Sequence, residues 1–137
     1  MLTVDYVTAI SVTHNSKHCI DALAKSLAAF NHIIIVDNGS SDGCPEKIAD
    51  VLPQAHLIQS ERNLGFGAAN NRALDLVQTP YALLLNPDCI VAPSEIGHLL
   101  KVATAYPEAA MIAPQLVRSG GLYEINPLIC GKSFCKI

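Results

Sequence analysis

Short apolar stretches alternate with amphipathic ones along the chain. Strands are predicted over residues 6–13, 32–37, 55–59 and 81–85, because each is rich in apolar or β-branched residues and is followed by polar or turn-forming residues. Each run has a length typical of a buried strand. The pattern therefore predicts four strands that enter one core.

Helix-like stretches separate these strands. Residues 20–29 place apolar side chains at helical spacing, a second helix runs to Val51 before Pro53, and residues 66–77 and 93–104 are predicted as two further helices. Strand and helix alternate, which is typical of βαβ units. The sequence thus predicts an α/β fold, a mainly parallel, Rossmann-like sheet flanked by helices.

The pattern weakens towards the C-terminus. A fifth strand is predicted over residues 109–117, at an edge of the sheet because Pro114 cannot donate a backbone hydrogen bond. Beyond Arg118 no clear periodicity remains. We therefore expect one domain over residues 1–118 and an irregular tail over residues 119–137.

Polar segments follow each of the first four strands. They read "THN", "DNGSSDG", "ERNLGFG" and "NPD" in chain order. In open parallel sheets, ligands bind at the carboxyl ends of the strands. These four strand exits therefore predict one binding site on one edge of the sheet.

Composition narrows the class of protein. The chain has 137 residues, half of them apolar, with a net charge of −3 and no basic cluster, so nucleic acid is not an expected partner. Its five cysteines show no C-x-x-C spacing and indicate free thiols in a reducing compartment. No signal peptide or membrane-spanning run is evident. We expect a cytoplasmic location.

Two short motifs suggest other functions. Residues 39–43 match G-x-S-x-G, the nucleophile elbow of α/β-hydrolases, with Ser41 as nucleophile, although Asp37 and Asn38 separate the glycine from the strand. Residues 65–70 nearly match G-x-G-x-x-G, a dinucleotide-binding fingerprint, with Asn70 in place of the third glycine. Both remain minor alternatives at this point.

The four polar segments in their order and spacing carry a more specific resemblance. "ISVTHN", "IIIVDNGSSDG", "ERNLGFGAANNRAL" and "YALLLNPDCIV" resemble the N-terminal nucleotide-sugar-binding part of family 2 glycosyltransferases, which have the GT-A fold, and the rhamnosyltransferase-like members most. The resemblance covers residues 7–117. It implies a nucleoside diphosphate sugar as donor, and a role in cell-wall or polysaccharide biosynthesis.

The resemblance assigns roles to residues after the first two strands. Thr13 and Asn15 would line the nucleotide pocket, and Asp37 would accept a hydrogen bond from the base or the ribose. Gly39 and Gly43 would let the backbone turn tightly beside the ligand.

The segments after the third and fourth predicted strands are expected to contact the diphosphate. Asn63, Gly65, Asn70 and Arg72 match the family's turn and helix after the third strand, where helix N–H groups and an arginine favour phosphate. In "NPD", Asn86 and Asp88 stand where the family carries D-x-D. One aspartate can suffice for Mg²⁺ or Mn²⁺ when phosphate oxygens complete the coordination. Asp88 is therefore the expected metal ligand.

The implied reaction is glycosyl transfer with inversion to a glycan or lipid-linked acceptor, either in the cytoplasm or at the inner face of the membrane. It needs a carboxylate base, and none is assigned, because Glu124 is the only acid after Glu108 and nothing marks it. The resemblance implies a fold truncated on its C-terminal side. An uncovered apolar sheet face would favour a homo-oligomer. The alternative is a non-catalytic nucleotide-binding or interaction module of the same fold.

Overall fold

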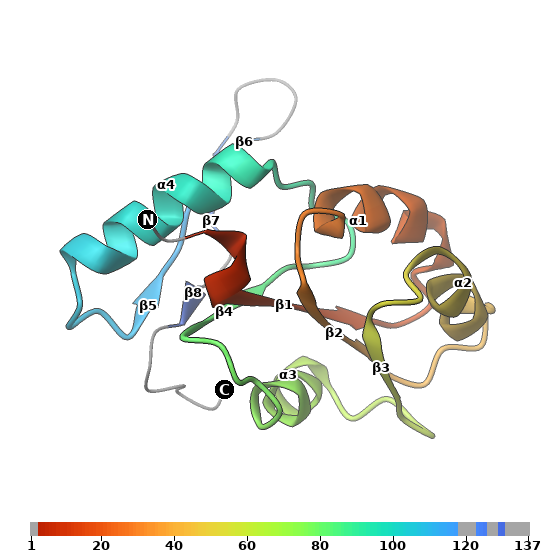
Figure 1. The fold of residues 1–137 in the computed structure, drawn as a ribbon. Coiled ribbons are helices and arrows are strands. Elements are labelled where there is room, and N and C mark those ends of the chain that lie inside the picture. The colour runs from red at the N-terminus through yellow and green to blue at the C-terminus, as the bar shows by residue number, and fades with distance from the viewer. Residues whose placement is uncertain (1–2, 118–122, 126–128, 131–137) are drawn as a thin grey trace.

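A six-stranded sheet runs through the computed structural model, which describes residues 3–117, 123–125 and 129–130 (Figure 1). Four strands pair in parallel in the order β3-β2-β1-β4. They are β1 (Val7–Thr13), β2 (His32–Asp37), β3 (His56–Gln59) and β4 (Tyr81–Leu84). The predicted mainly parallel α/β sheet is confirmed.

Two short strands complete this sheet beyond β4. β8 (Ile129–Cys130) is antiparallel to β4, and β5 (Met111–Ile112) is antiparallel to β8. A strand from near the end of the described chain therefore lies between two strands that come much earlier in the sequence.

Helices cover both faces of the sheet unequally. Figure 1 shows α1, α2 and α4 on one face and α3 on the other. The helices are α1 (Ile20–Leu27), α2 (Cys44–Val51), α3 (Phe66–Leu74) and α4 (Pro93–Ala105), with short 3₁₀ turns η1 (Val4–Tyr6) and η2 (Lys17–Cys19). For the first four strand and helix pairs, the predicted bounds agree with the structure to within three residues.

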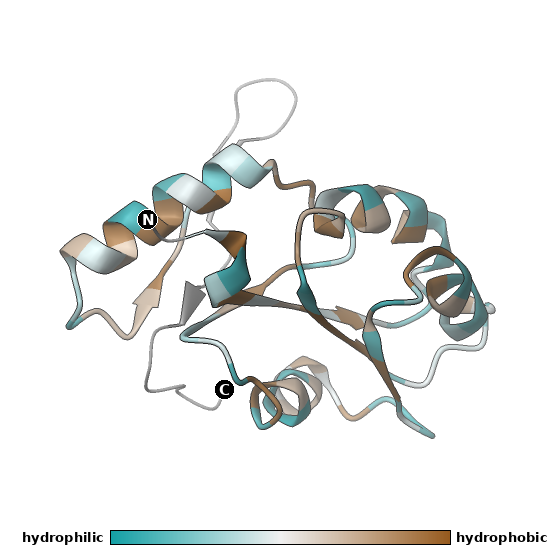
Figure 2. Ribbon diagram, in the orientation of Figure 1, coloured by the Kyte–Doolittle hydropathy of each residue, from teal (hydrophilic) through white to brown (hydrophobic). Residues whose placement is uncertain are grey.

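Two apolar clusters lie on the two faces because side chains alternate along a strand. Ile35 points into the cluster with α1, α2 and α4, whereas Ile34 and Val36 point into the cluster with α3. Figure 2 shows the helices with apolar and hydrophilic residues on different sides, as expected for elements that cover a core. The helix α3 contributes mainly small residues, Ala69 and Ala73, so it packs close to the sheet.

The predicted fifth strand is wrong in its extent. Residues 109–117 form two strands, β5 and β6 (Gln115–Val117), which lie in different sheets. Pro114 separates them, because proline lacks the N–H that a continuous ladder needs. β6 pairs with β7 (Tyr123–Ile125) in a separate two-stranded sheet. The segment 119–137, predicted to be irregular, therefore contains β7 and β8, and its other residues lie outside the described ones.

Candidate functional site

The carboxyl ends of β1, β2, β3 and β4 meet at one edge of the sheet, and two cavities open there. The Asp37 cavity has a volume of about 720 Å³ and the Asp88 cavity about 420 Å³. The first is lined by Lys17, Asp37, Ser40, Ser41, Gly43, Pro45, Glu46, Lys47, Asp50, Gln59 and Ser60. The second is lined by Val12, His14, Asn15, Ser16, His18, Cys19, Asn38, Asn63, Phe66, Asn86, Pro87 and Asp88.

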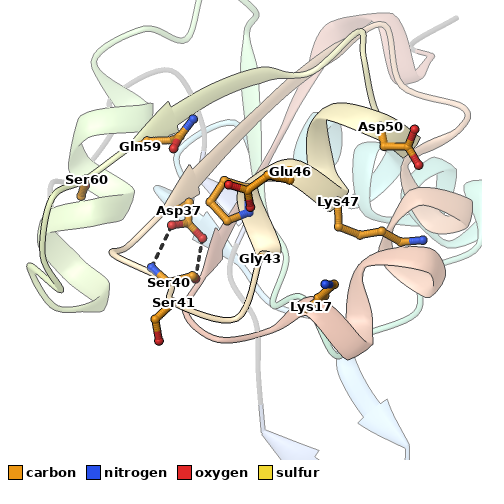
Figure 3. A pocket seen from close by; sticks show the side chains of 11 residues that line it. Lys17, Asp37, Ser40, Ser41, Gly43, Glu46, Lys47, Asp50, Gln59 and Ser60 are labelled. Carbon is orange, nitrogen blue, oxygen red and sulfur yellow. Dashed lines mark hydrogen bonds between the residues drawn. The ribbon is translucent and has the colours of Figure 1, made fainter.

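Asp37 is a buried carboxylate at the end of β2, and its side chain is only 2% exposed. Its Oδ1 accepts hydrogen bonds from the Thr13 hydroxyl at 3.0 Å and the Ser40 hydroxyl at 2.5 Å. Its Oδ2 accepts the Ser40 backbone N–H at 2.9 Å. Figure 3 shows the two bonds to Ser40 as dashed lines. The protein's own donors therefore satisfy much of the charge that burial removes from water.

The loop after β1 is tied to the loop after β2 through Asn15. The amide oxygen of Asn15 accepts the Ser41 N–H at 2.9 Å, and its own N–H donates to Ser40 Oγ at 2.9 Å. Asn15 has a φ of 50°, in the left-handed region that asparagine tolerates better than most residues. The Ser41 hydroxyl also donates to Asn15 Oδ1, at 3.4 Å, so this hydroxyl bonds an amide rather than a histidine.

Asp42 closes the same loop from the other side. Its carboxylate accepts the Lys17 N–H at 2.9 Å and the Cys44 N–H at 3.0 Å. These bonds, the Lys17 one foremost, hold the pKa of the Asp42 carboxyl below its usual value. Gly43 follows with a φ of 81° and leads into α2.

Asn38 has a structural role at the site that the sequence did not reveal. It is 2% exposed, and its amide nitrogen donates to Asn63 Oδ1 at 2.8 Å and to the Gly65 carbonyl at 3.3 Å. Its amide oxygen accepts the Leu64 N–H at 2.8 Å. One side chain therefore fixes the turn that precedes α3. An asparagine after a strand is common in ordinary turns, so the sequence offered no signal for this role.

Gly39 lets two of these loops touch. A Cβ at this position would lie 2.7 Å from the Arg62 carbonyl carbon, and its φ is 76°. A side chain is therefore excluded both by space and by backbone conformation. The predicted tight turn at Gly39 serves contact between the loops after β2 and β3.

Asp88 differs from Asp37 because it is exposed. It lies in the turn after β4 beside Asn86, and its Oδ1 accepts a weak hydrogen bond from the Cys89 thiol at 3.8 Å. Burial, assisted by the charge of Asp88, raises the pKa of the Cys19 and Cys89 thiols. Both thiols therefore stay protonated at neutral pH, and the carboxylate is the negative group of this cavity.

Among the residues that line the Asp88 cavity without having been predicted are His14 and Phe66. His14 bonds through Nδ1 to the Asn38 carbonyl at 3.0 Å, so Nδ1 carries the proton and donates. Phe66, the first residue of α3, is 53% exposed although it is aromatic. The cavity therefore offers an imidazole and an apolar ring surface beside the carboxylate.

The other predicted site residues fall into three groups. Asn15, Asn63 and Asn86 line the Asp88 cavity. Gly43 lines the Asp37 cavity, and Arg72 borders it, since its guanidinium donates to Ser60 Oγ at 2.7 Å.

Thr13, Gly65 and Asn70 line neither cavity. Thr13 has no exposed surface and supports Asp37. Gly65 has a φ of 84° at the start of α3, and its N–H donates to Asn63 Oδ1. Asn70 is 1% exposed and donates to the Phe66 carbonyl at 3.0 Å within α3. These three residues support other residues of the site and do not line its cavities.

A divalent cation would rely on few protein ligands. In the part of the chain that the structure describes, no three His, Cys, Asp or Glu side chains lie close enough to hold a metal ion together. One exposed carboxylate with open space beside it fits a cation whose other ligands are phosphate oxygens and water.

Comparison with known families decides the classification. The family model described as glycosyl transferase family 2 matches residues 8–134, nearly the whole chain. The chain belongs to glycosyl transferase family 2. This membership supports the transferase interpretation over the hydrolase and dinucleotide alternatives.

A curated relative of this family 2 chain is the N-acetylglucosaminyl-diphospho-decaprenol L-rhamnosyltransferase of Mycobacterium tuberculosis. The two are 26% identical over 87% of this chain and 44% of the relative. The Rhizobium meliloti succinoglycan biosynthesis protein ExoO is 27% identical over 72% of this chain and 30% of its own. The chain therefore spans less than half the length of these relatives.

Solved structures share the GT-A fold of this family 2 chain. The mannosyltransferase PcManGT of Pyrobaculum calidifontis, in complex with GDP-mannose and Mn²⁺, has a TM-score of 0.72 at 21% identity over 82% of this chain and 36% of its own. TarS of S. aureus in complex with UDP-GlcNAc has a TM-score of 0.63 at 21% identity over 83% of this chain and 35% of its own.

The helices of the described residues were also compared with the length and hydropathy that a membrane span needs. None of these helices meets both requirements.

Proposed function

We propose that this chain binds a nucleoside diphosphate sugar and a divalent cation and contributes the donor site for inverting glycosyl transfer. The observation that carries the proposal is the pair of cavities at the strand exits, one built around a buried carboxylate and one around an exposed carboxylate. Family membership and the nucleotide-sugar complexes of the structural neighbours support it.

The two cavities suit different parts of the donor. Asp37 is an acceptor-only group when it is ionised, which suits the N–H or O–H of a nucleoside. Asp88 would hold the cation together with phosphate oxygens, and Asn86 lies beside it. When bound, the cation neutralises the negative charge that develops on the departing diphosphate. Asn15 and Asn63 offer amide groups to the sugar or the phosphates.

The acceptor side of the reaction has no residue assigned to it in this chain. An acceptor hydroxyl must lose a proton to a base, and we assign no described residue of this chain to that role. The M. tuberculosis relative is named for a lipid-linked acceptor. We propose a glycan or lipid-linked acceptor here as well, reached from the cytoplasm or the inner membrane surface.

Calorimetric titration with UDP, dTDP and GDP, each with and without Mn²⁺, tests the donor site. We expect at least one nucleotide to bind, and Mn²⁺ to strengthen its binding at least tenfold, which is about 1.4 kcal/mol. In Asp88→Asn this metal dependence should disappear while the protein stays folded. Glu108→Gln provides a charge-matched control on the exposed turn after α4, outside both cavities.

The outcomes separate the two classes of function. Unchanged Mn²⁺ dependence in Asp88→Asn removes this residue from the metal role, and no binding by the folded protein overturns the proposal. Metal-dependent binding without transfer or hydrolysis of any nucleotide sugar favours the second candidate, a non-catalytic nucleotide-binding module. The observation that favours this candidate is that, among the described residues, Asp88 has too few metal-binding side chains near it to form a group of three.

A further inference from the structure

Another cavity lies at the amino ends of β1, β2 and β3, at the opposite end of the sheet from the strand exits. It has a volume of about 290 Å³, and we call it the histidine cavity. It is lined by Thr8, Asn31, His32, Ile33, Ile34, Gln54, His56, Leu76 and Gln78. No Asp, Glu, Lys or Arg is among these described residues, so the cavity offers neutral nitrogen and oxygen groups.

His32 and His56 lie on the same face of the sheet. His56 is the register partner of Ile34 in the parallel pairing of β2 with β3, and Ile34 points into the apolar cluster with α3. Side chains alternate along a strand, so His32, two residues before Ile34, points to this face as well. The two imidazoles therefore line one cavity from neighbouring strands.

The spacing of the two histidines suits a shared ligand. They are one strand apart and two residues apart along the strand direction, because His56 pairs with Ile34. With about 4.8 Å between strands and about 3.3 Å per residue, their Cα atoms lie about 8 Å apart. Aromatic side chains on one face of a sheet reach each other across such a diagonal. Both rings can therefore turn towards one ion.

Both imidazoles are available to a ligand. The chain has five histidines. Nδ1 of His14 bonds to a backbone carbonyl, and Nδ1 of His98 lies 4.0 Å from a carboxylate oxygen of Glu95. Among the described residues, no hydrogen bond or ion pair engages the ring of His32 or His56, and both residues are exposed. Their ring nitrogens can therefore bind an ion that reaches the cavity from solvent.

The chemistry of imidazole selects the kind of ion. Neutral imidazole is a common ligand of Zn²⁺, Cu²⁺ and Ni²⁺, whereas Mg²⁺ prefers carboxylate and water oxygens. In the described part of the chain, no group of three His, Cys, Asp or Glu side chains forms here. Gln54 and Gln78 line the same cavity, and an amide oxygen and water can complete the coordination.

We propose that His32 and His56 together bind a divalent transition-metal ion in the histidine cavity. The ion joins β3, which is an edge strand, to β2. It prefers nitrogen ligands, and so differs in chemistry from the cation proposed at Asp88. The inference goes beyond the proposed function and does not depend on it.

Calorimetric titration of the whole chain with Ni²⁺, without nucleotide, tests this site. Ni²⁺ is the probe because the free cysteines of the chain compete for it less than for Zn²⁺. Excess Mg²⁺ is present, since it competes for carboxylate sites but not for imidazoles. We expect one Ni²⁺ to bind per chain.

Histidine variants then identify the ligands. His32→Ala and His56→Ala should each weaken Ni²⁺ binding at least tenfold, because each removes one of the two nitrogens. His98→Ala removes an exposed histidine of α4 outside the cavity and should leave Ni²⁺ binding unchanged.

Thermal unfolding gives a second measurement. An ion that binds the folded chain raises its melting temperature as the ion concentration rises. We expect this rise in the unmodified chain and in His98→Ala, but not in the other two variants. Melting without Ni²⁺ checks that the variants remain folded, as is usual for exposed positions.

The outcomes separate this site from the donor site. No Ni²⁺ binding by the folded chain, or binding that either His32→Ala or His56→Ala retains in full, overturns the inference. Asp88→Asn should keep its Ni²⁺ binding, and a loss there would place the ion at Asp88 instead. The donor site is judged by Mn²⁺-dependent nucleotide binding, so each proposal can fail while the other stands.

Discussion

The two carboxylates at the strand exits are held in opposite ways. Asp37 is 2% exposed and accepts three hydrogen bonds from Thr13 and Ser40. Asp88 is exposed, and its described contact is a weak one with the Cys89 thiol. A carboxylate satisfied by its own chain is part of the fold, whereas one left open to solvent can change its partners. One edge of a sheet can therefore combine a carboxylate that is fixed by hydrogen bonds within the chain with a carboxylate that is open to a ligand.

Replacing each of the two aspartates by alanine is expected to give the largest difference in the free energy of unfolding. Asp37→Ala leaves the buried Thr13 hydroxyl, the half-buried Ser40 hydroxyl and a backbone N–H without their acceptor, so the free energy of unfolding should fall by about 3 kcal/mol. Asp88→Ala should change it by less than about 0.5 kcal/mol, as is usual for exposed positions. Urea denaturation of both variants measures the contrast. Equal losses would show that Asp88 is as much a structural residue as Asp37.

Glycine substitutions probe the backbone of the loops after β2 and β3. Gly39→Ala should cost about 2 kcal/mol, because its Cβ would meet the Arg62 backbone at 2.7 Å and its φ is 76°. Gly65→Ala should cost about 1 kcal/mol, from its φ of 84° alone, since a Cβ there would lie in open space.

The helical Gly97 serves as the matched control for these two. Alanine there meets nothing within 4 Å and should stabilise α4 by about 0.5 kcal/mol. Thermal unfolding of the three variants ranks them. A Gly39→Ala protein as stable as the unmodified chain would mean that the loops after β2 and β3 can separate freely.

The smallest expected effect concerns pH. The folded pKa of Asp42 lies below its usual value of 3.8, so the unfolded chain takes up the proton first as pH falls. Its contribution to stability is therefore present above about pH 4 and is lost as pH falls through the folded pKa. The stability difference between the unmodified chain and Asp42→Asn should shrink over that range. A difference that stays constant with pH would exclude this carboxylate as its source.

Sequence patterns predicted the four parallel strands because each is a short apolar run with a clear turn after it. They failed at residues 109–117, since the partner of β5 is β8 and no local signal at residue 112 indicates a strand at residue 129. Pro114 indicated an interruption of the strand. It did not indicate that the residues before and after it would belong to different sheets.

The site was predicted as a set of residues but not as a geometry. Polar strand exits identified the correct edge, yet nothing in the sequence divided it into two cavities or placed Thr13 behind Asp37. Asn38 was missed because its importance comes from burial and from three partners in a distant loop. Side-chain direction is fixed by tertiary packing, which periodicity does not encode.

The position of β8 has a consequence for how the chain is made. The strands β3, β2, β1 and β4 can pair as soon as residue 84 has left the ribosome, but among the described residues the strand that pairs with the outer side of β4 is β8, at residues 129–130. During that interval β4 is an unprotected edge, able to pair with another nascent chain. Synthesis rate and chaperone access should therefore affect how much of this protein is obtained in soluble form.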